Sequence, residues 1–90
     1  PLPLANGLVL TIGRAPECHL MLPDSEVSRR HCTVEVEHGR VFVSDLGSIN
    51  GTLVNERRAQ RAEVRHGDVV TIGPYHLELL DEEAAQAWEA

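Results

Sequence analysis

The 90-residue sequence is poor in aromatic side chains, since Phe42, Tyr75 and Trp88 are the only ones. Its hydrophobic core must therefore be built from Val, Leu and Ile. No hydrophobic run is long enough to span a bilayer, and no signal peptide is recognisable. These absences indicate one small soluble domain, because a chain of this length has room for a single core.

Cysteine is also scarce, and Cys18 and Cys32 lie too far apart to form a CxxC pair. A secreted domain held together by disulfides would carry more cysteines. The chain opens at Pro1 without an initiator Met. We therefore expect a cytoplasmic domain that forms part of a longer protein.

The chain contains no lysine, and its formal net charge of −6 comes from 14 Asp and Glu against eight Arg. Duplex nucleic acid is bound by basic surfaces that neutralise phosphates, so this charge disfavours nucleic acid as a partner. One small basic pocket remains compatible with the composition. Guanidinium suits bidentate phosphate recognition better than ammonium does, although codon bias explains the absence of lysine more simply.

Short stretches of alternating apolar and polar residues, separated by turn residues, predict β-strands along most of the chain. Two hairpins are expected, with turns at His38-Gly39 and Gly73-Pro74. The strands are expected at residues 8–12, 19–22, 32–37, 40–46, 52–54, 69–72 and 75–80. Strands at this density predict an all-β sandwich of two antiparallel sheets.

The end of the chain departs from this pattern. Residues 81–90, DEEAAQAWEA, have a helical composition, with acidic residues early, where the helix dipole favours them. We therefore divide the chain into a sandwich over residues 1–80 and an acidic tail over residues 81–90, which is a short helix or a disordered segment.

Three predicted loops hold polar residues that the strands do not need. They are Gly13-Arg14, Ser28-Arg29-Arg30-His31 and Gly47-Ser48-Ile49-Asn50-Gly51-Thr52. Alternate connections of a sandwich fall at the same end, so separated loops can converge there and bind a ligand. Arginines, a hydroxyl and a carboxamide together form a donor-rich patch. Such a patch suits a phosphate monoester, which carries about −1.5 to −2 charges and three acceptor oxygens.

The same residues resemble the signature of the forkhead-associated (FHA) family, in its order and at its usual spacings, from about Leu8 to Leu80. The matching pieces are Gly13-Arg14, Leu22-Pro23-Asp24, Ser28-Arg29-Arg30-His31, Asp45-Leu46-Gly47-Ser48, Asn50-Gly51-Thr52-Leu53-Val54-Asn55 and Gly67-Asp68. Each piece alone is a weak signal, and the pieces in register are a strong one. The resemblance implies a sandwich of two antiparallel sheets that binds phosphothreonine peptides with loops at one end.

The resemblance also implies roles for individual residues. Arg14, Ser28 and Arg29 match positions that bind the phosphate, and Asn50 matches one that hydrogen-bonds the peptide main chain. Ile49 stands where many relatives carry Ser or Thr, so its branched side chain would supply an apolar contact near the peptide instead of a hydrogen bond.

Other matching residues are implied to shape the loops without touching the ligand: Gly13, His31, Gly51 and Thr52. Arg30, between better candidates, is expected to be a surface charge. A pocket for the threonine methyl group would favour phosphothreonine over phosphoserine, because one methyl group is worth about 1–3 kcal/mol.

The positions of the Cys and His residues do not favour a metal site. Cys18-His19 and His31-Cys32 form a mirrored pair, but adjacent residues on a strand point to opposite faces, and the spacings of zinc ligands are absent. We therefore expect no metal and no other cofactor. We expect Cys18 and Cys32 to be buried as small hydrophobic residues.

Catalysis is the rival class of function. Ser28, His31 and Asp45 supply the residue types of a hydrolase triad. However, Ser28 lacks a nucleophile-elbow sequence, and no oxyanion arrangement can be read from the chain. We therefore expect a binding module and not an enzyme.

The sequence thus predicts a monomeric domain that binds a phosphothreonine-containing segment of a partner or of its own parent protein, within a signalling or regulatory protein. The ligand should come from outside the domain, because its own threonines lie in or beside predicted strands: Thr11, Thr33, Thr52 and Thr71. The alternative is a phosphate-independent scaffold on the same fold, which docks partners on a sheet face or on the acidic tail.

Overall fold

The computed structural model describes residues 5–80, which form nine strands and contain no helix. No segment of this part of the chain is thus a helix that could cross a bilayer. The strands are β1 (Val9–Gly13), β2 (Leu20–Met21), β3 (Cys32–Glu37), β4 (Arg40–Asp45), β5 (Thr52–Val54), β6 (Arg57–Arg58), β7 (Arg61–Val64), β8 (Val69–Ile72) and β9 (Tyr75–Glu78). The acidic tail lies outside the described residues.

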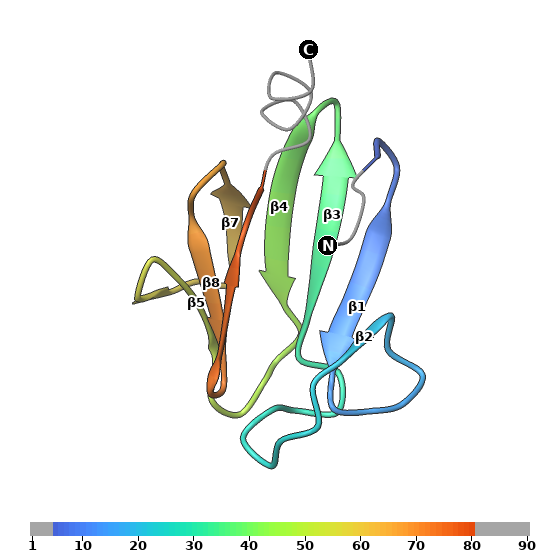
Figure 1. The fold of residues 1–90 in the computed structure, drawn as a ribbon, viewed down its shortest axis with the longest axis vertical. Coiled ribbons are helices and arrows are strands. Elements are labelled where there is room, and N and C mark those ends of the chain that lie inside the picture. The colour runs from blue at the N-terminus through green and yellow to red at the C-terminus, as the bar shows by residue number, and fades with distance from the viewer. Residues whose placement is uncertain (1–4, 81–90) are drawn as a thin grey trace.

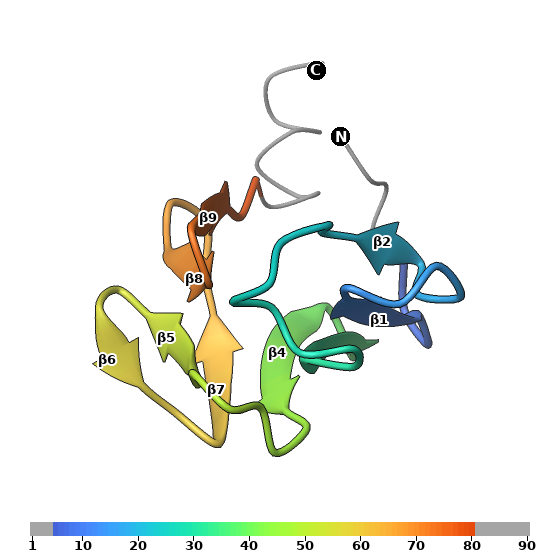
Figure 2. The same cartoon turned by 90° about the horizontal axis from the view of Figure 1, so that it is seen from below.

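The strands form two sheets that face each other (Figures 1 and 2), in the orders β2-β1-β3-β4-β7 and β6-β5-β8-β9. The predicted all-β sandwich is confirmed. One pairing differs from the prediction, because β1 and β2 run parallel, with Ile12 opposite Leu20. The short connection of residues 14–19 suffices for this arrangement because β2 contains only two residues.

Two strands were not predicted, and both are rich in charge. Strand β6 is Arg57–Arg58, and β7 has the sequence RAEV, whose Arg, Ala and Glu have little intrinsic preference for strands. Strand β7 forms because it pairs with β4, which places Val64 opposite Val41 and Ala62 opposite Val43. Tertiary pairing therefore overrides local propensity at this edge of the sheet.

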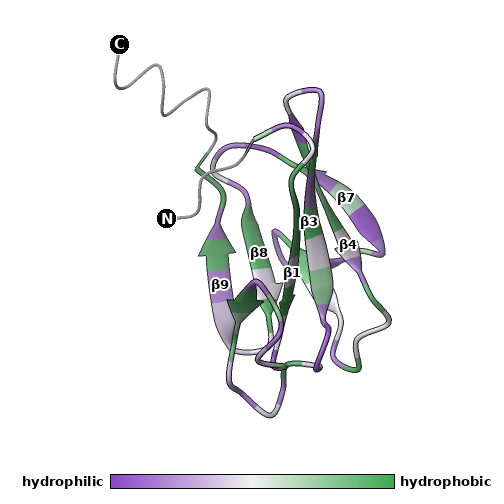
Figure 3. Ribbon diagram, turned by 90° about the vertical axis from the view of Figure 1, so that its right-hand side faces the viewer, coloured by the Kyte–Doolittle hydropathy of each residue, from purple (hydrophilic) through white to green (hydrophobic). Residues whose placement is uncertain are grey.

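The core lies between the sheets and is aliphatic, as the composition requires. Figure 3 shows apolar residues alternating with polar ones along the strands. Its buried residues are Ile12, Leu22, Val27, Cys32, Val36, Val41, Val43, Val64, Val70 and Ile72. Leu22 and Val27 belong to the connection between β2 and β3, so this loop is anchored in the core at two points.

The outer face of the five-stranded sheet is polar and centres on Phe42. The guanidinium of Arg61 stacks over its ring at 4.3 Å, and that of Arg40 lies 5.5 Å from the ring centroid. Arg40 also makes two hydrogen bonds of 2.9 Å to the Glu63 carboxylate. These bonds hold the pKa of Glu63 below its usual value. The charges on this face are therefore largely paired with each other.

The connections β1–β2, β2–β3 and β4–β5 all lie at one end of the sandwich, together with the β8–β9 turn (Figure 1). The β3–β4 and β7–β8 turns lie at the opposite end. The three polar loops of the sequence are therefore neighbours, as predicted. Gly13 makes one of their closest contacts, since a Cβ atom there would lie 2.2 Å from the Arg29 carbonyl oxygen.

We predict that Gly13→Ala lowers the free energy of unfolding by at least about 3 kcal/mol, because backbone atoms of the neighbouring loop leave no room for a methyl group. Gly39→Ala is the matched control. Gly39 has a positive φ of 76° but nothing within 4 Å of its Cβ position, so only about 1 kcal/mol should be lost. Urea denaturation measures both values, and equal losses would show that the close approach at Gly13 is unimportant.

Candidate functional site

The first polar loop is bonded to the second through the main chain. The N–H of Arg14 donates to the carbonyl of Ser28 at 2.9 Å, and the N–H of Ala15 donates to the carbonyl of Arg29 at 3.1 Å. Ala15 is buried beneath this contact. The two segments, distant in sequence, therefore run side by side like a continuation of the sheet.

The Arg14 side chain is exposed, and one of its nitrogens is fixed in place. Its Nε donates to the carbonyl of Val27 at 3.1 Å. Within residues 5–80, its two terminal nitrogens have no hydrogen bond or ion pair. The guanidinium is therefore held beside Val27, and its two terminal nitrogens can still donate hydrogen bonds. It also borders an open depression lined by Pro23, Asp24 and Ser25.

The third loop is bonded to the second by side chains that the sequence singled out. The N–H of Ile49 donates to Ser28 Oγ at 3.1 Å, and Asn50 Nδ2 donates to the carbonyl of Glu26 at 2.8 Å. The second loop thus makes direct contact with both of the others. The structure places Arg14, Ser28, Ile49 and Asn50 at one junction.

His31 braces this junction from inside, and its side chain is completely buried. Its Nδ1 accepts a hydrogen bond from the Ser28 N–H at 3.1 Å. Because Nδ1 accepts, the proton of the neutral ring is on Nε2, which then donates to the carbonyl of Gly51 at 2.8 Å. His31 therefore links the second loop to the third.

The same bonds argue against a hydrolase triad. A catalytic histidine would bond the Ser28 hydroxyl with one nitrogen and the Asp45 carboxylate with the other. Here His31 bonds the main chain of Ser28 and of Gly51, and the Ser28 hydroxyl oxygen accepts from Ile49. Each candidate triad residue instead has a structural partner.

Asp45 organises the third loop. Its Oδ2 accepts from the N–H groups of Gly47 and Ser48, each at 3.0 Å, and its Oδ1 accepts from the hydroxyls of Ser48 at 2.5 Å and Thr52 at 2.7 Å. Ser48 Oγ in turn accepts from the Gly51 N–H at 2.9 Å. Desolvation acts to raise the pKa of Asp45, but these donors outweigh it and hold the pKa below its ordinary value.

Gly51 has a positive φ of 84°, and a Cβ atom there would lie 2.6 Å from Arg58 Nε. Arg58 therefore covers the backbone of the third loop. No sequence motif singles out this residue. Its position depends on the pairing of β6 with β5, which puts Arg58 opposite Leu53, and the two-residue strand β6 carries no recognisable pattern.

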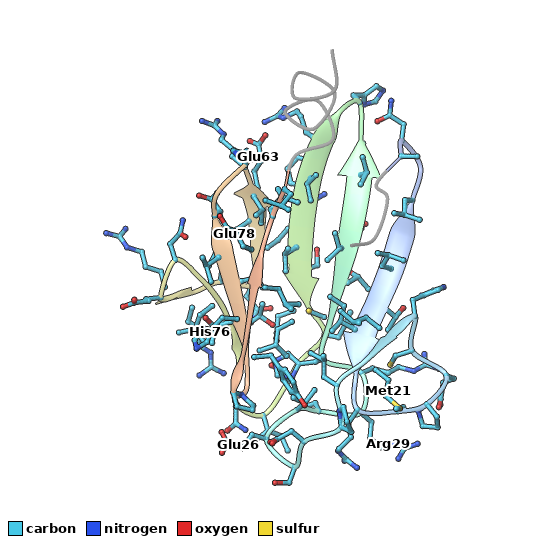
Figure 4. All side chains as sticks on the ribbon, in the orientation of Figure 1. Met21, Glu26, Arg29, Glu63, His76 and Glu78 are labelled. Carbon is cyan, nitrogen blue, oxygen red and sulfur yellow. The ribbon has the colours of Figure 1, made fainter. Side chains whose placement is uncertain are left out.

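Arg29 is exposed at the same end of the molecule. Figure 4 shows Arg29 and Glu26 projecting from this end, whereas Glu63 lies towards the other. The main chain of Arg29 is fixed, because its carbonyl accepts hydrogen bonds from the Ala15 N–H and, at 3.2 Å, from Cys18 Sγ. The connection between β2 and β3 therefore presents a cation at Arg29 and a carboxylate at Glu26 on separate parts of its surface.

The two cysteines are buried. Burial raises the pKa of the Cys32 thiol to about 12. Cys18 Sγ donates a hydrogen bond to the carbonyl of Arg29. The Nδ1 atom of His19 accepts a hydrogen bond from the N–H of Thr11. Within residues 5–80 no group of three or more His, Cys, Asp or Glu side chains is placed to hold a metal ion.

The fold and its loop end define a class of protein: a β-sandwich whose convergent loops bring guanidinium, hydroxyl and carboxamide groups together. The FHA domain family model matches residues 10–73. The chain belongs to the FHA domain family. Members of this family are interaction modules.

Known relatives agree with this assignment. The chain is 38% identical over 77 residues to the glycogen accumulation regulator GarA of Mycobacterium tuberculosis, covering 86% of this chain and 48% of that protein. It is 40% identical over 75 residues to the oxoglutarate dehydrogenase inhibitor of Corynebacterium efficiens, covering 83% of this chain and 53% of that protein. The chain therefore spans about half the length of these curated relatives.

A solved structure shows the same fold. It comes from a structural and functional analysis of phosphothreonine-dependent FHA domain interactions, and it has a TM-score of 0.77 and 35% sequence identity to this chain. The match covers 83% of this chain and 77% of the solved one. All three polar loops that meet at Ser28 fall within the region that the family model matches.

We predict that Asp45→Asn lowers the free energy of unfolding at pH 7 by about 2 kcal/mol or more. The N–H groups of the new amide would face the N–H groups of Gly47 and Ser48, which now donate to the carboxylate, so these hydrogen bonds would be lost. A carboxyl group whose pKa is lowered on folding stabilises the native state above its unfolded pKa of about 3.9, and this contribution is lost as the pH falls through the folded pKa. The difference between the two proteins should therefore shrink from pH 7 to below pH ~4.

Urea midpoints of both proteins across this pH range provide the measurement. Glu63 and Asp68 also have lowered pKa values, through bonds from Arg40 and from the Arg65 N–H respectively. Both proteins share these groups, so their effects cancel in the difference. A difference that stayed constant with pH would contradict the role given to the Asp45 carboxylate.

Proposed function

We propose that this domain binds phosphothreonine-containing peptides at the junction of its three loops, and so mediates a phosphorylation-dependent protein interaction. The observation that carries the proposal is the bonding around Ser28. Its carbonyl accepts from Arg14 N–H, and its hydroxyl accepts from Ile49 N–H. An exposed guanidinium, a hydroxyl and a carboxamide thus share one surface.

The unused donors at this junction match a phosphate. Ser28 Oγ accepts a hydrogen bond from Ile49, which leaves its own hydrogen free to donate. Arg14 has its terminal nitrogens available, and Arg29 is exposed nearby. Charge-assisted bonds contribute roughly 1.5–3 kcal/mol each. Two or three of them would therefore supply a large part of the binding free energy of a micromolar complex, which is about −8 kcal/mol.

Asn50 is suited to bind the peptide main chain. One N–H of its carboxamide donates a hydrogen bond to the carbonyl of Glu26. The carboxamide oxygen and the second N–H remain, which are the acceptor and the donor that a peptide group requires. Asn50 would thus hold the peptide backbone while Arg14 and Ser28 hold the phosphate.

The loop-shaping residues act through these contacts. Gly13 allows the first two loops to approach, His31 ties Ser28 to Gly51, and Thr52 donates to Asp45. We propose that none of them touches the ligand. Their substitution should therefore weaken binding only by disturbing Arg14, Ser28 or Asn50.

The relatives support threonine as the phosphorylated residue and regulation as the setting. The solved relative comes from a study of phosphothreonine-dependent interactions, and the curated ones are named a regulator and an inhibitor. We propose a non-catalytic, cytoplasmic module without a cofactor, monomeric by itself, with its sandwich in residues 1–80 and a separate tail in residues 81–90. Every threonine of the chain lies in a strand of this sandwich, which favours a ligand from elsewhere: Thr11, Thr33, Thr52 and Thr71.

We predict that Arg14→Ala weakens the binding of a phosphothreonine peptide by about 10- to 100-fold, because at least one charge-assisted bond to the phosphate is lost. Isothermal calorimetry measures this, with a peptide selected from a degenerate phosphothreonine library. The fold should remain, since the Arg14 side chain is exposed and outside the core.

Arg30→Ala is the matched control, because Arg30 is also exposed, belongs to the same loop end and has no side-chain partner within residues 5–80. Its affinity should change less than about threefold. Unchanged affinity in Arg14→Ala would remove Arg14 from the site.

We further predict that one peptide in three forms binds in the order phosphothreonine, phosphoserine, threonine. The phosphoserine form should bind about 5- to 100-fold more weakly, as expected for one lost methyl group, and the unphosphorylated form should not bind measurably. Fluorescence anisotropy with labelled peptides gives all three affinities. Equal affinity for the phosphorylated and unphosphorylated forms would favour the phosphate-independent scaffold.

A further inference from the structure

Half of the eight arginines lie in one short segment of the chain. Residues 57–65, RRAQRAEVR, contain four Arg and one Glu, so their net charge is +3 in a chain whose total is −6. They form β6, β7 and the link between these strands. Strand β6 ends the four-stranded sheet and β7 ends the five-stranded one, and both lie on the same side of the sandwich (Figure 2). We call this side the basic edge.

The arginines of the basic edge lack close partners. Within residues 5–80, the side chains of Arg57 and Arg58 make no hydrogen bond or ion pair. Arg61 and Arg65 have carboxylates at 3.9 Å and 3.7 Å, and the one beside Arg65 already accepts two hydrogen bonds of 2.9 Å from Arg40. Charged side chains on edge strands discourage pairing with other sheets, but that protection does not require charge of one sign. The positive excess therefore fits an acidic occupant.

Hydrogen bonds at Asp68 fix the end of the described chain relative to the basic edge. The Leu79 N–H donates to the Asp68 carbonyl at 2.9 Å. The Asp68 carboxylate accepts from the Arg65 N–H at 2.8 Å and from Asn55 Nδ2 at 3.0 Å. Arg65 ends the basic segment, and Asn55 lies two residues before its start. The last described residue, Leu80, therefore directly follows a residue that is bonded where both ends of the basic segment meet.

We propose that the acidic tail, residues 81–90, docks along the basic edge of its own chain. The tail has four acidic residues and no basic one: Asp81, Glu82, Glu83 and Glu89. The first three follow Leu80 directly, so the connectivity of the chain brings them beside Arg65 and the start of β6. Exposed ion pairs are individually weak, but a short tether gives a millimolar effective concentration, and several pairs then act together.

Trp88 gives the tail a further means of contact. It is the only Trp of the chain, and indole is the aromatic group that binds a guanidinium best. Arg57 and Arg58 stand opposite Val54 and Leu53 in the β5–β6 pairing, so their side chains lie on the two faces of β6. An indole ring that docks beside either guanidinium is shielded from solvent, and its fluorescence reports this shielding.

The test measures how acrylamide, a neutral quencher, quenches the fluorescence of Trp88 in the full chain. Arg57→Glu reverses one charge of the basic edge. Arg30→Glu is the matched control, because Arg30 is also exposed, has no side-chain partner within residues 5–80 and lies at the loop end. Glu82→Gln/Glu83→Gln removes two charges of the tail and leaves the sandwich unaltered. Urea denaturation confirms that each variant is folded.

The quenching constants of the wild type and of Arg30→Glu should roughly double between about 0.01 M and about 1 M NaCl, because the screening length falls from about 30 Å to about 3 Å and the tail is released. In Arg57→Glu and in Glu82→Gln/Glu83→Gln the constant should already be high at low salt. It should then change by less than about 1.2-fold with added salt.

Two kinds of result would overturn the inference. A wild-type constant that does not depend on salt, or equal constants in Arg57→Glu and Arg30→Glu, would reject docking on the basic edge. A constant that falls as the protein concentration rises would assign the tail to the edge of a second copy and reject the contact within one chain. Neither result bears on phosphopeptide binding, because no peptide is present in the measurement.

Discussion

The loop end depends on one buried imidazole. His31 accepts from the Ser28 N–H and donates to the Gly51 carbonyl, which lies 20 positions away in the sequence. Because the ring is wholly buried, water cannot replace either bond, and losing one would leave a buried polar group unpaired. The hydroxyl of Ser28 and the carboxamide of Asn50 thus keep their separation only while this brace is in place.

Polar residues of the loops divide into two groups by the state of their hydrogen bonds. Asp45, Ser48 and His31 have their polar atoms engaged inside the protein, and they determine loop shape. Arg14 and Asn50 each use one donor internally and keep others available. Sequence proximity does not separate the groups, because Ser48 and Asn50 are near neighbours with opposite roles. What separates them is exposure, since His31 and Ser48 are buried and Asp45 is half-buried, whereas Arg14 and Asn50 are exposed.

Much of the fold could be predicted from alternation and turn residues, because β3, β4, β8 and β9 have apolar faces that fit a sandwich. Strands β6 and β7 could not, since their charged sequences form strands only through pairing with β5 and β4. For the site, the resemblance to FHA domains supplied the candidates, and their convergence followed from loop placement. Contacts such as Asn50 with the Glu26 main chain, or Arg58 with Gly51, join residues whose relation no local pattern encodes.

Val27 connects this surface to the interior. Its side chain is 1% exposed within the aliphatic core, its carbonyl holds Arg14, and a methyl group of the side chain lies 3.0 Å from the Cβ position of Gly73 in the β8–β9 turn. The loop end is thus held in shape by the same packing that holds the sheets together, and such preorganisation lowers the conformational entropy that any association would cost. By thermodynamic linkage, a ligand that occupies only the native state raises the melting temperature of the whole sandwich.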